Sequence, residues 1–436
     1  MKYRTFDTVQ EIANWRLCAG CGACAAVCPE NALRLLDIQE QGIRPLVDSA
    51  RCNRCGECVK VCPGISLSHE PFSNQTLIEL RQAWGPVLEV WEGYASDTEV
   101  RYKGSSGGAV TALALSFLAR EDGSGVLHIG ANPEAPLVNV PVFSRTREEL
   151  LAYIGSRYSP AAPCSGIEWI RASKRPCVFI GKPCDVAALR KLQILKPELK
   201  NKVGLAISIF CAGTPSSDGN KAIFDVLGVR EEEVEEIRYR GFGWPGFTVV
   251  KVKGGSNQTR RMTYEQSWGG ILSKHVPLRC RLCPDGTGEF ADISCGDPWY
   301  RGIEPNEPGW SLILARTVKG REFLHSAVES GYIRLVQAEP RILTLSQKSL
   351  LNKRRNLWGR IVAMRIMKVP VPHYTGFSLF KNWLDLSAVS QLRSVIGTLR
   401  RVMLRMWRKP VKPSIPARRI QEFINTTTNQ GKSREN

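Results

Sequence analysis

A repeated pattern of cysteines near the start of the chain constrains the fold more than any other feature. The pattern Cys-x-x-Cys-x-x-Cys-x-x-x-Cys-Pro stands at residues 18–29 and again at residues 52–63. The second run is therefore an internal repeat of the first. This spacing is typical of proteins that bind two 4Fe-4S clusters, in which the fourth cysteine of each run is a ligand of the other cluster.

The ligand sets are expected to cross over between the two runs. One cluster takes Cys18, Cys21, Cys24 and Cys62. The other cluster takes Cys28, Cys52, Cys55 and Cys58. Small residues such as Gly20, Gly22 and Gly56 let backbone N–H groups approach the sulfur atoms. A pair of zinc sites is the alternative, and it is disfavoured because zinc sites rarely use this eight-cysteine spacing.

The fifteen cysteines of the chain need an explanation other than disulfides. The sequence begins without the apolar stretch of a secretory signal, and no apolar run approaches the ~20 residues that span a bilayer. We therefore expect a globular protein of the reducing cytoplasm, where clustered cysteines usually bind metal. At 436 residues, the chain is long enough for two or three domains.

The chain is expected to be an α/β protein in three parts. Residues 8–70 are predicted to form a dicluster ferredoxin-like module, with a short hairpin at residues 33–47. After a polar linker, residues 88–345 alternate short apolar runs with helical patterns, which predicts an α/β flavin domain with a mixed sheet. Residues 346–436 are predicted to be a basic helical extension with a disordered tail. Within the second part, the expected strands are 177–180 and 205–210, and the expected helices are 109–119, 185–192 and 220–227.

A glycine-rich turn at residues 103–108 lies between the strand-like residues 91–96 and an apolar helix that starts at Ala109. Such a turn presents free N–H groups at a helix N-terminus and suits a phosphate or another anion. Its spacing is not that of a dinucleotide-binding fingerprint, so a tight structural turn is an equal alternative.

This turn and four other stretches resemble one family. They are residues 103–111, 155–160, 181–184, 210–211, and 280–285 together with 291–293. Over roughly residues 10–340 the chain resembles the beta subunits of coenzyme F-420 hydrogenase and dehydrogenase, a family with formate dehydrogenase beta subunits and 7-hydroxymethyl chlorophyll a reductase-like proteins. The resemblance implies an N-terminal ferredoxin module joined to a flavin domain, bound FAD, further iron–sulfur ligands and electron exchange with an organic substrate.

A flavin also suits the chemistry that the residues imply. A 4Fe-4S cluster moves one electron, whereas reduction of a double bond or a deazaflavin ring needs two electrons with protons or hydride. The sequence has no Cys-x-x-Cys-His haem motif, and its five histidines form no pair with metal-ligand spacing. Flavin is therefore the economical converter.

Four further cysteines are predicted to bind a third 4Fe-4S cluster beside the flavin. They are Cys184, Cys211, Cys280 and Cys283. Cys184 and Cys211 each follow a predicted buried strand, and ligands gather at the carboxyl ends of strands in open α/β sheets. Cys295 competes as the fourth ligand, and inert buried thiols are the alternative, which is the interpretation for Cys164 and Cys177.

Residues for FAD or the substrate are predicted in the glycine-rich turn and in Gly/Pro-rich loops, where polar or aromatic side chains are easily placed beside a ligand. They are Lys103, Ser105, Ser106, Gly107, Gly108, Arg157, Tyr158, Ser159, Lys182, Arg240 and Trp244. Lys182 or an arginine suits the FAD pyrophosphate or an acidic substrate tail, and Trp244 suits stacking on a ring. Ordinary surface loop residues are the alternative. The sequence identifies no catalytic acid.

Positive charge is concentrated near the end of the chain. Residues 353–419 contain sixteen Lys or Arg and one acid, Asp385, which gives +15 of the formal +19. Seven apolar residues recur there at helical spacing: Leu392, Val395, Ile396, Leu399, Val402, Met403 and Met406. This pattern predicts a basic amphipathic helix that lies on an anionic membrane surface, docks on an acidic partner or packs on the body of the protein.

The sequence thus predicts a cytoplasmic iron–sulfur flavoprotein oxidoreductase, peripheral to the inner face of the membrane if the basic helix binds lipid. Its electrons are expected to come from ferredoxin or a partner subunit and to reduce coenzyme F-420 or another unsaturated small molecule. A non-catalytic electron-relay subunit of a hydrogenase or dehydrogenase is the alternative. Nucleic-acid binding, suggested only by the net charge, is disfavoured because it leaves the flavin-like motifs without a role.

Overall fold

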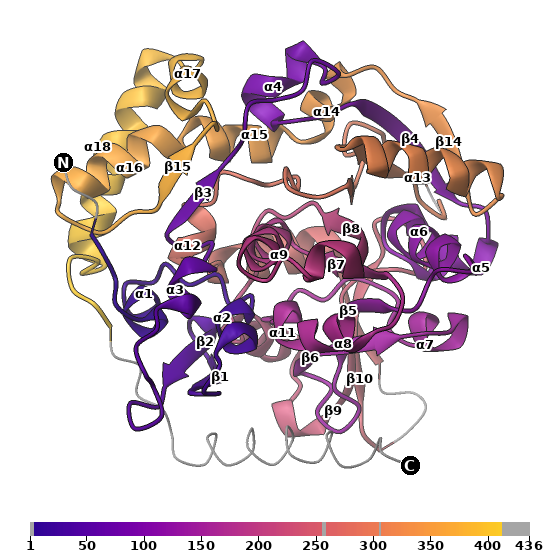
Figure 1. Cartoon of the computed structure of the whole chain (residues 1–436), viewed down its shortest axis with the longest axis horizontal. Helices are drawn as coiled ribbons and strands as arrows, with labels where there is room; N and C mark the ends of the chain where they lie inside the picture. The colour runs from indigo at the N-terminus through magenta and orange to yellow at the C-terminus, as the bar shows by residue number, and fades with distance from the viewer. Residues whose placement is uncertain (1–3, 255–258, 305–306, 412–436) are drawn as a thin grey trace.

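An eight-stranded mixed sheet lies at the centre of the chain (Figure 1). The computed structural model describes residues 4–254, 259–304 and 307–411. The strands run in the order β14 Ile333–Gln337, β4 Glu89–Ala95, β13 Ser311–Ala315, β12 Ile293–Gly296, β8 Val203–Ile209, β7 Cys177–Gly181, β5 Val126–Ala131 and β6 Asn139–Ser144. From β12 to β5 the neighbouring strands are parallel, and the remaining neighbours are antiparallel. The predicted mixed sheet is confirmed, and β7 and β8 lie at the two expected strands.

Helices cover both faces of this sheet, because successive strand residues point to opposite sides. Val178 faces a core that includes α6 (Ala109–Leu118) and α13 (Val318–Glu329). Phe179 faces a second core with α8 (Ile167–Ala172) and α9 (Pro183–Leu195). The result is a three-layer α/β arrangement around a partly parallel sheet.

A smaller antiparallel sheet stands beside the large one. It consists of β11 Thr259–Thr263, β10 Phe247–Val252 and β9 Val234–Arg238. Its core includes Ile223 and Phe224 of α11 (Asp218–Leu227). The other elements of this part of the chain are α4 Ile78–Trp84, α5 Thr98–Lys103, η1 Ser106–Gly108, α7 Arg147–Leu151, η2 Pro163–Gly166, α10 Leu199–Lys202, η3 Glu231–Glu233, η4 Glu265–Ile271, η5 Leu272–His275 and α12 Leu278–Arg281.

The N-terminal module packs against the α9 side of the sheet, since Ala23, Val27 and Val61 share the core of that face. Its elements are α1 Val9–Asn14, α2 Ala23–Val27, β1 Leu33–Ile38, β2 Gly42–Val47, α3 Glu57–Lys60 and β3 Ser66–Ser68. The predicted hairpin is confirmed, with β1 and β2 antiparallel.

The C-terminal extension packs on the N-terminal module. Its elements are α14 Arg341–Ser346, α15 Lys348–Arg355, α16 Leu357–Ile366, β15 His373–Thr375, α17 Leu379–Leu384 and α18 Ala388–Leu404. β15 pairs in parallel with β3 (Figure 1). Leu357 and Val402 share a core with Ile12 of α1. Of the three roles considered for the basic helix, packing on the body is thus confirmed for one face of α18. The disordered tail predicted after Pro410 lies, from residue 412 on, outside the described residues, and the predicted bounds 8–70, 88–345 and 346–436 stay predictions.

Candidate functional site

Four cysteines of the N-terminal module lie close together: Cys18, Cys21, Cys24 and Cys62. Burial raises the pKa of the Cys24 thiol, and the thiols of Cys18, Cys21 and Cys62 raise it further. Burial likewise raises the pKa of Cys62 to about 12, with added contributions from Cys18 and Cys21. Such interactions between charges act over short distances. The structure therefore brings together the set expected for the first cluster, and the assignment of these residues as ligands stays a prediction.

Two glycines at equivalent places in the repeat shape the cysteine loops. Gly22 (φ 85°) and Gly56 (φ 74°) precede α2 and α3 in the left-handed conformation that other residues rarely adopt. A Cβ at Gly22 would also meet the backbone nitrogen of Ser165 at 2.9 Å, so the loop lies directly against the larger part of the chain. The N–H of Gly20 donates to Cys18 Sγ at 3.3 Å, a contact of the kind that tunes iron–sulfur clusters.

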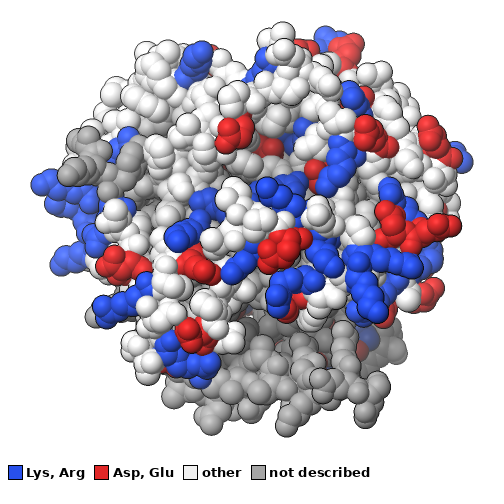
Figure 2. Space-filling model, in the orientation of Figure 1, with Lys and Arg blue, Asp and Glu red and all other residues white. Residues whose placement is uncertain are grey.

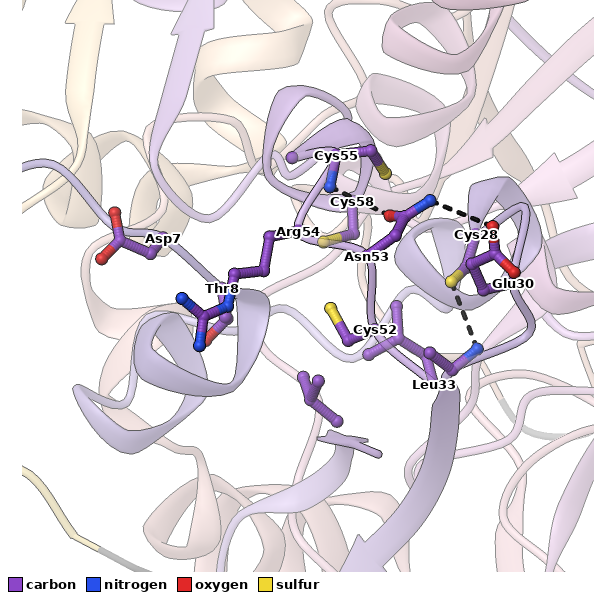
Figure 3. A pocket seen from close by; sticks show the side chains of 13 residues that line it. Asp7, Thr8, Cys28, Glu30, Leu33, Cys52, Asn53, Arg54, Cys55 and Cys58 are labelled. Atoms are coloured by element: carbon purple, nitrogen blue, oxygen red, sulfur yellow. Dashed lines mark hydrogen bonds between the residues drawn. The ribbon is translucent and has the colours of Figure 1, made fainter. Parts of the chain in front are cut away.

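The other four cysteines of the repeat line a pocket in the module (Figure 3): Cys28, Cys52, Cys55 and Cys58. Burial raises the pKa of Cys58, and its three neighbouring cysteines add to the shift. The N–H of Ala32 donates to Cys28 Sγ at 3.3 Å. Cys55 is exposed, and the other three are partly buried. Four thiols around a hollow fit a 4Fe-4S cluster close to the surface.

A third group of cysteines comes from three separate segments: Cys184, Cys211, Cys280 and Cys283. Cys184 is in the first turn of α9 directly after β7, and Cys211 follows β8, so both lie where parallel strands end. Burial raises the pKa of Cys211 to about 12, and Cys280 and Cys283 act on it as neighbours. Burial also raises the pKa of Cys184, with Cys211 and Cys283 among its neighbours. The donor set of four thiols fits a third cluster.

The remaining cysteines do not join this group. Cys295, the competing fourth ligand, lies in β12 within the core under α6, and burial alone raises its pKa to about 12. Cys177 is buried in the core of the opposite face. Cys164 is also buried but contacts a predicted ligand, because its hydrogen bond lowers the pKa of Cys21. The third set therefore contains Cys184, Cys211, Cys280 and Cys283 without Cys295.

A buried arginine, Arg279, lies between the first and the third cysteine set. Burial alone would lower the pKa of its guanidinium, but Tyr374 and then the cysteines of the third set, Cys283 first, raise it above its usual value. The same guanidinium acts on Cys18 of the first set, whose pKa burial raises. Arg279 donates to the carbonyl oxygen of Pro63 at 2.9 Å and to the Tyr374 hydroxyl at 3.0 Å. The Arg279 side chain thus lies close to cysteines of both sets.

Lys182 also lies between these two sets. Its Nζ is 2.7 Å from Asp185 Oδ2. Burial lowers the pKa of Lys182, but Asp185 and Cys184 raise it above its usual value. Lys182 acts on Cys21 as well. The structure therefore places this residue, predicted for FAD or the substrate, among the cysteines, where its charge can offset that of thiolates.

Three of the residues predicted for FAD or the substrate converge on Asp297. Arg240 binds both carboxylate oxygens, with distances of 2.8 and 2.6 Å, and Trp244 Nε1 donates at 2.8 Å. The hydroxyl of Ser106 also donates to this carboxylate. Burial would raise the pKa of Asp297, but Arg240 and these hydrogen bonds hold it below its usual value. The glycine-rich turn was predicted to suit a phosphate or another anion, and the structure places the carboxylate of Asp297 beside it.

Aromatic rings surround the Arg240 guanidinium. Its Cζ lies 5.0 Å from the ring centre of Tyr264, and Tyr264 stacks on Trp299 with 5.1 Å between ring centres. The ring centres of Trp244 and Trp299 are 5.4 Å apart. Tyr158 is close to Arg240, and burial raises the pKa of its hydroxyl. Aromatic faces beside a fixed charge suit a planar polar ligand.

The other predicted FAD or substrate residues are engaged within the protein. Arg157 donates to Asn139 Oδ1 at 2.7 Å and to two backbone carbonyl oxygens. The Ser159 hydroxyl accepts from Asn220 at 3.2 Å, and Lys103 forms an exposed ion pair with Glu99. Their assignment to FAD or the substrate stays a prediction.

The glycine-rich turn is tightly packed. Gly107 and Gly108 both have φ 73°, and a Cβ at Gly108 would meet the carbonyl oxygen of Val100 at 2.5 Å. The Ser105 hydroxyl accepts from the backbone and the hydroxyl of Ser156. Close packing therefore explains the glycines, which agrees with the alternative that these residues form a tight structural turn.

Sequence reasoning missed several members of the site. Asp297 and Trp299 stand in a Gly-Asp-Pro-Trp stretch directly after β12, and a polar residue at the end of a buried strand was the available signal. Arg279 and Tyr374 are far apart in the sequence, and nothing in it indicated that they meet.

Among the described residues, no helix combines the length and apolar character that crossing a membrane requires. The same residues contain no group of three or more His, Cys, Asp or Glu side chains that could hold a metal ion. In a 4Fe-4S cluster, by contrast, the four thiolates are spread over four iron atoms.

Three family models match the chain. Residues 17–64 match the 4Fe-4S dicluster domain. Residues 90–167 match the N-terminal part of the coenzyme F420 hydrogenase/dehydrogenase beta subunit, and residues 175–341 match its C-terminal part. All eight cysteines of the repeat and the four of the third set fall inside these matches.

Similar proteins occur in Methanococcus voltae, Methanocaldococcus jannaschii and Methanosarcina barkeri. The coenzyme F420 hydrogenase subunit beta of Methanococcus voltae is 29% identical over 293 residues, which are 64% of this chain and 95% of that protein. The F420-dependent formate dehydrogenase subunit beta of Methanocaldococcus jannaschii is 24% identical over 58% of this chain and 63% of its own length. A chain in the xenon-derivatised F420-reducing [NiFe] hydrogenase complex of Methanosarcina barkeri has a similar fold, with a TM-score of 0.50 at 22% identity, covering 64% of this chain and 94% of that chain.

Proposed function

The chain belongs to the coenzyme F420 hydrogenase/dehydrogenase beta subunit family, and we propose that it is an iron–sulfur flavoprotein oxidoreductase. Single electrons from ferredoxin or a partner subunit pass along the cysteine sets to FAD and then to a two-electron organic acceptor, coenzyme F-420 or another unsaturated compound. Iron–sulfur clusters supply one-electron steps, and a flavin supplies the conversion to two-electron chemistry.

The observation that carries this proposal is the arrangement of three cysteine sets in series. Arg279 contacts the surroundings of the first and third sets, and Lys182 lies near Cys21 and Cys184. The first and second sets belong to one repeat, and Cys58 is among the neighbouring thiols that raise the pKa of Cys24. Electron tunnelling slows steeply with distance, so cysteine sets that lie close to one another suit a relay.

The second set is the proposed entry point for electrons. Cys55 is exposed there, and Arg54 beside it lines the same pocket (Figure 3). The third set lies instead in the larger part of the chain, where Cys184 and Cys211 follow β7 and β8. The direction from entry to acceptor then runs from the second set through the first to the third.

The proposed flavin and acceptor site is the cluster around Arg240. Asp297 fixes the guanidinium by two hydrogen bonds, and the rings of Tyr264, Trp299 and Trp244 lie beside it. Aromatic faces beside fixed polar groups favour a flat polar ring. We further propose a cytoplasmic location, in which thiols stay reduced until clusters assemble.

A second candidate function is an electron-relay subunit without an acceptor of its own. The relatives that are beta subunits of a hydrogenase and of a formate dehydrogenase favour it, as does the exposed Cys55. In that case the partner subunit supplies or consumes the electron pair.

Anaerobic purification followed by flavin extraction and an assay with a reduced viologen dye tests both candidates. An enzyme is expected to release FAD and to reduce coenzyme F-420 as the isolated chain. A relay subunit would be reduced by the dye but would reduce F-420 only with a partner present. Material without iron–sulfur absorption and without extractable flavin would contradict the proposal.

A further inference from the structure

We propose that one face of α18 binds the surface of a membrane that contains anionic lipids. The α18 outer face is defined by Val389, Leu392, Ile396 and Met403, whose side chains are 66%, 60%, 53% and 60% exposed. These residues recur at intervals of three, four and seven, so they form one row along a 17-residue helix. An exposed apolar row of this kind is uncommon unless it meets another apolar phase.

Packing explains why the apolar row faces outward. The buried side of α18 consists of small or short side chains, Ser394, Thr398 and Val402. A Cβ at Gly359 of α16 would lie 2.0 Å from the hydroxyl oxygen of Ser394, so the two helices approach too closely for large residues at this contact. The Ser394 hydroxyl also accepts from Trp383 Nε1 at 3.1 Å. The helix is therefore held by its small face, and Leu392 and its neighbours cannot turn inward without breaking this contact.

Charge identifies anionic lipid as the partner. Between residues 388 and 411 there are six Lys or Arg and no Asp or Glu. Arg393 and Arg400 are exposed and alternate with the apolar row along the same helix. Long basic side chains beside an apolar row can lie at the headgroups while the row enters the acyl boundary. An acidic protein partner would use the arginines but leave the four apolar residues without a role.

Neighbouring elements extend this surface. Leu404 and Met406 continue past the row, and Phe380 and Leu384 of α17 are also largely exposed. In Figure 2 the surface over α16–α18, at the upper left, is mostly white with basic patches. Because Val402 and Trp407 share a core with Ile12 and Trp15, lipid binding would hold the N-terminal module next to the membrane.

The test is flotation of the iron-loaded full chain with lipid vesicles. One vesicle type contains phosphatidylcholine with phosphatidylglycerol, and the other contains phosphatidylcholine alone. The chain is expected to float with the anionic vesicles and to remain behind with the neutral ones. Replacing Leu392, Ile396 and Met403 together by Ser should reduce the bound fraction about tenfold or more, because the apolar contribution to interfacial binding is lost.

Matched controls separate this effect from general surface changes. Ile194→Ser with Val226→Ser removes two side chains that are 75% and 67% exposed on other helices, and vesicle binding should not change. Arg393→Gln with Arg400→Gln should weaken binding and make it less sensitive to salt. A chain ending at residue 411 should still bind, because the row lies wholly within α18. The visible spectrum of each variant verifies that the fold is intact.

Four results would overturn the proposal. The first is a wild-type chain that does not float with anionic vesicles. The second is a triple Ser variant that binds as well as wild type, and the third is binding that disappears in the chain ending at residue 411. The fourth is a dimer in light scattering that the triple Ser variant dissociates, which would assign the face to a second copy of the chain.

Discussion

The first and second cysteine sets differ from the third in how the chain assembles them. The eight N-terminal cysteines lie within one repeat between Cys18 and Cys62, and a hairpin and short helices close that segment on itself. The third set joins Cys184, Cys211 and the pair at 280 and 283, which come together only when the large sheet and α12 are in place. A local repeat can position its own ligands, whereas an assembled site depends on distant contacts.

Those distant contacts come largely from the C-terminal extension. Arg354 of α15 forms a buried ion pair with Glu289 and donates to the carbonyl oxygens of Pro284 and Phe377. His69 meets the other oxygen of Glu289 at 2.9 Å. The loop that follows Cys283 is therefore fixed by residues from the end of the N-terminal module and from the extension. The extension, which the sequence presented mainly as a carrier of charge, is part of the framework of the third set.

Replacement of Arg354 should have the largest effect, and it should weaken the third cysteine set more than the first and second sets. Arg354→Met leaves the Glu289 carboxylate buried without its guanidinium, and losing one partner of a buried pair costs about 3–5 kcal/mol of folding free energy. Urea unfolding should show this loss, and iron analysis should show loss from the third set before the other two. Arg341→Met, which removes an exposed arginine paired with Glu339, is the matched control and should change stability by less than about 0.5 kcal/mol. Equal effects of the two substitutions would argue against the framework role.

Low pH should weaken the interactions of the Glu289 carboxylate with Arg354 and His69. Burial would raise the pKa of Glu289, but Arg354 and His69 lower it to about 2. An unfolded glutamate titrates near about 4.3, so the unfolded chain takes up this proton first as the pH falls. The stabilisation from the charged carboxylate is therefore complete above about pH 5 and is lost as the pH drops toward 2. Urea midpoints at a series of pH values should fall less steeply in this window for Glu289→Gln than for the wild type. Parallel pH profiles would contradict the assignment.

Loss of one hydroxyl should have a smaller effect. The Tyr374 hydroxyl donates to the carbonyl oxygen of Leu282 at 2.7 Å and accepts from Arg279 at 3.0 Å. Tyr374→Phe leaves both groups buried without this partner, which should cost about 1–3 kcal/mol and shift the reduction potential of the third set. Tyr300→Phe removes a more exposed hydroxyl bonded to Glu92 and should alter neither property. An unchanged potential in Tyr374→Phe would show that Arg279 is held without the tyrosine.

The smallest effect is expected at Lys103, in the glycine-rich turn. Its exposed ion pair with Glu99 should contribute little, so Lys103→Gln should change stability by less than about 0.5 kcal/mol. Flavin content should also stay at the wild-type level, because the groups proposed to hold the ring surround Arg240 instead. A large loss of bound flavin would move the FAD site toward the turn.

The same contrast explains which parts could be predicted from the sequence. The hairpin β1–β2 and the strands β7 and β8 follow from local patterns of apolar residues, and these predictions are confirmed. The exposure of the apolar row of α18 could not be predicted. A helical pattern shows which residues share a face of the helix but not whether that face is buried. The close approach of Gly359 to Ser394 buries the opposite face and leaves the apolar row exposed. The position of Asp297 after a buried strand indicated a site residue, but its partners Ser106 and Arg240 could not be predicted because they are distant in the sequence.

Iron content in two cysteine variants tests the central claim most directly, namely that three separate cysteine sets each hold a cluster. Anaerobically prepared wild-type chain should contain about twelve iron atoms. Cys55→Ser and Cys283→Ser should each lose about four, from the second and the third set respectively, and the double variant should lose about eight. A wild type with about eight iron atoms, together with unchanged iron in Cys283→Ser, would contradict the account.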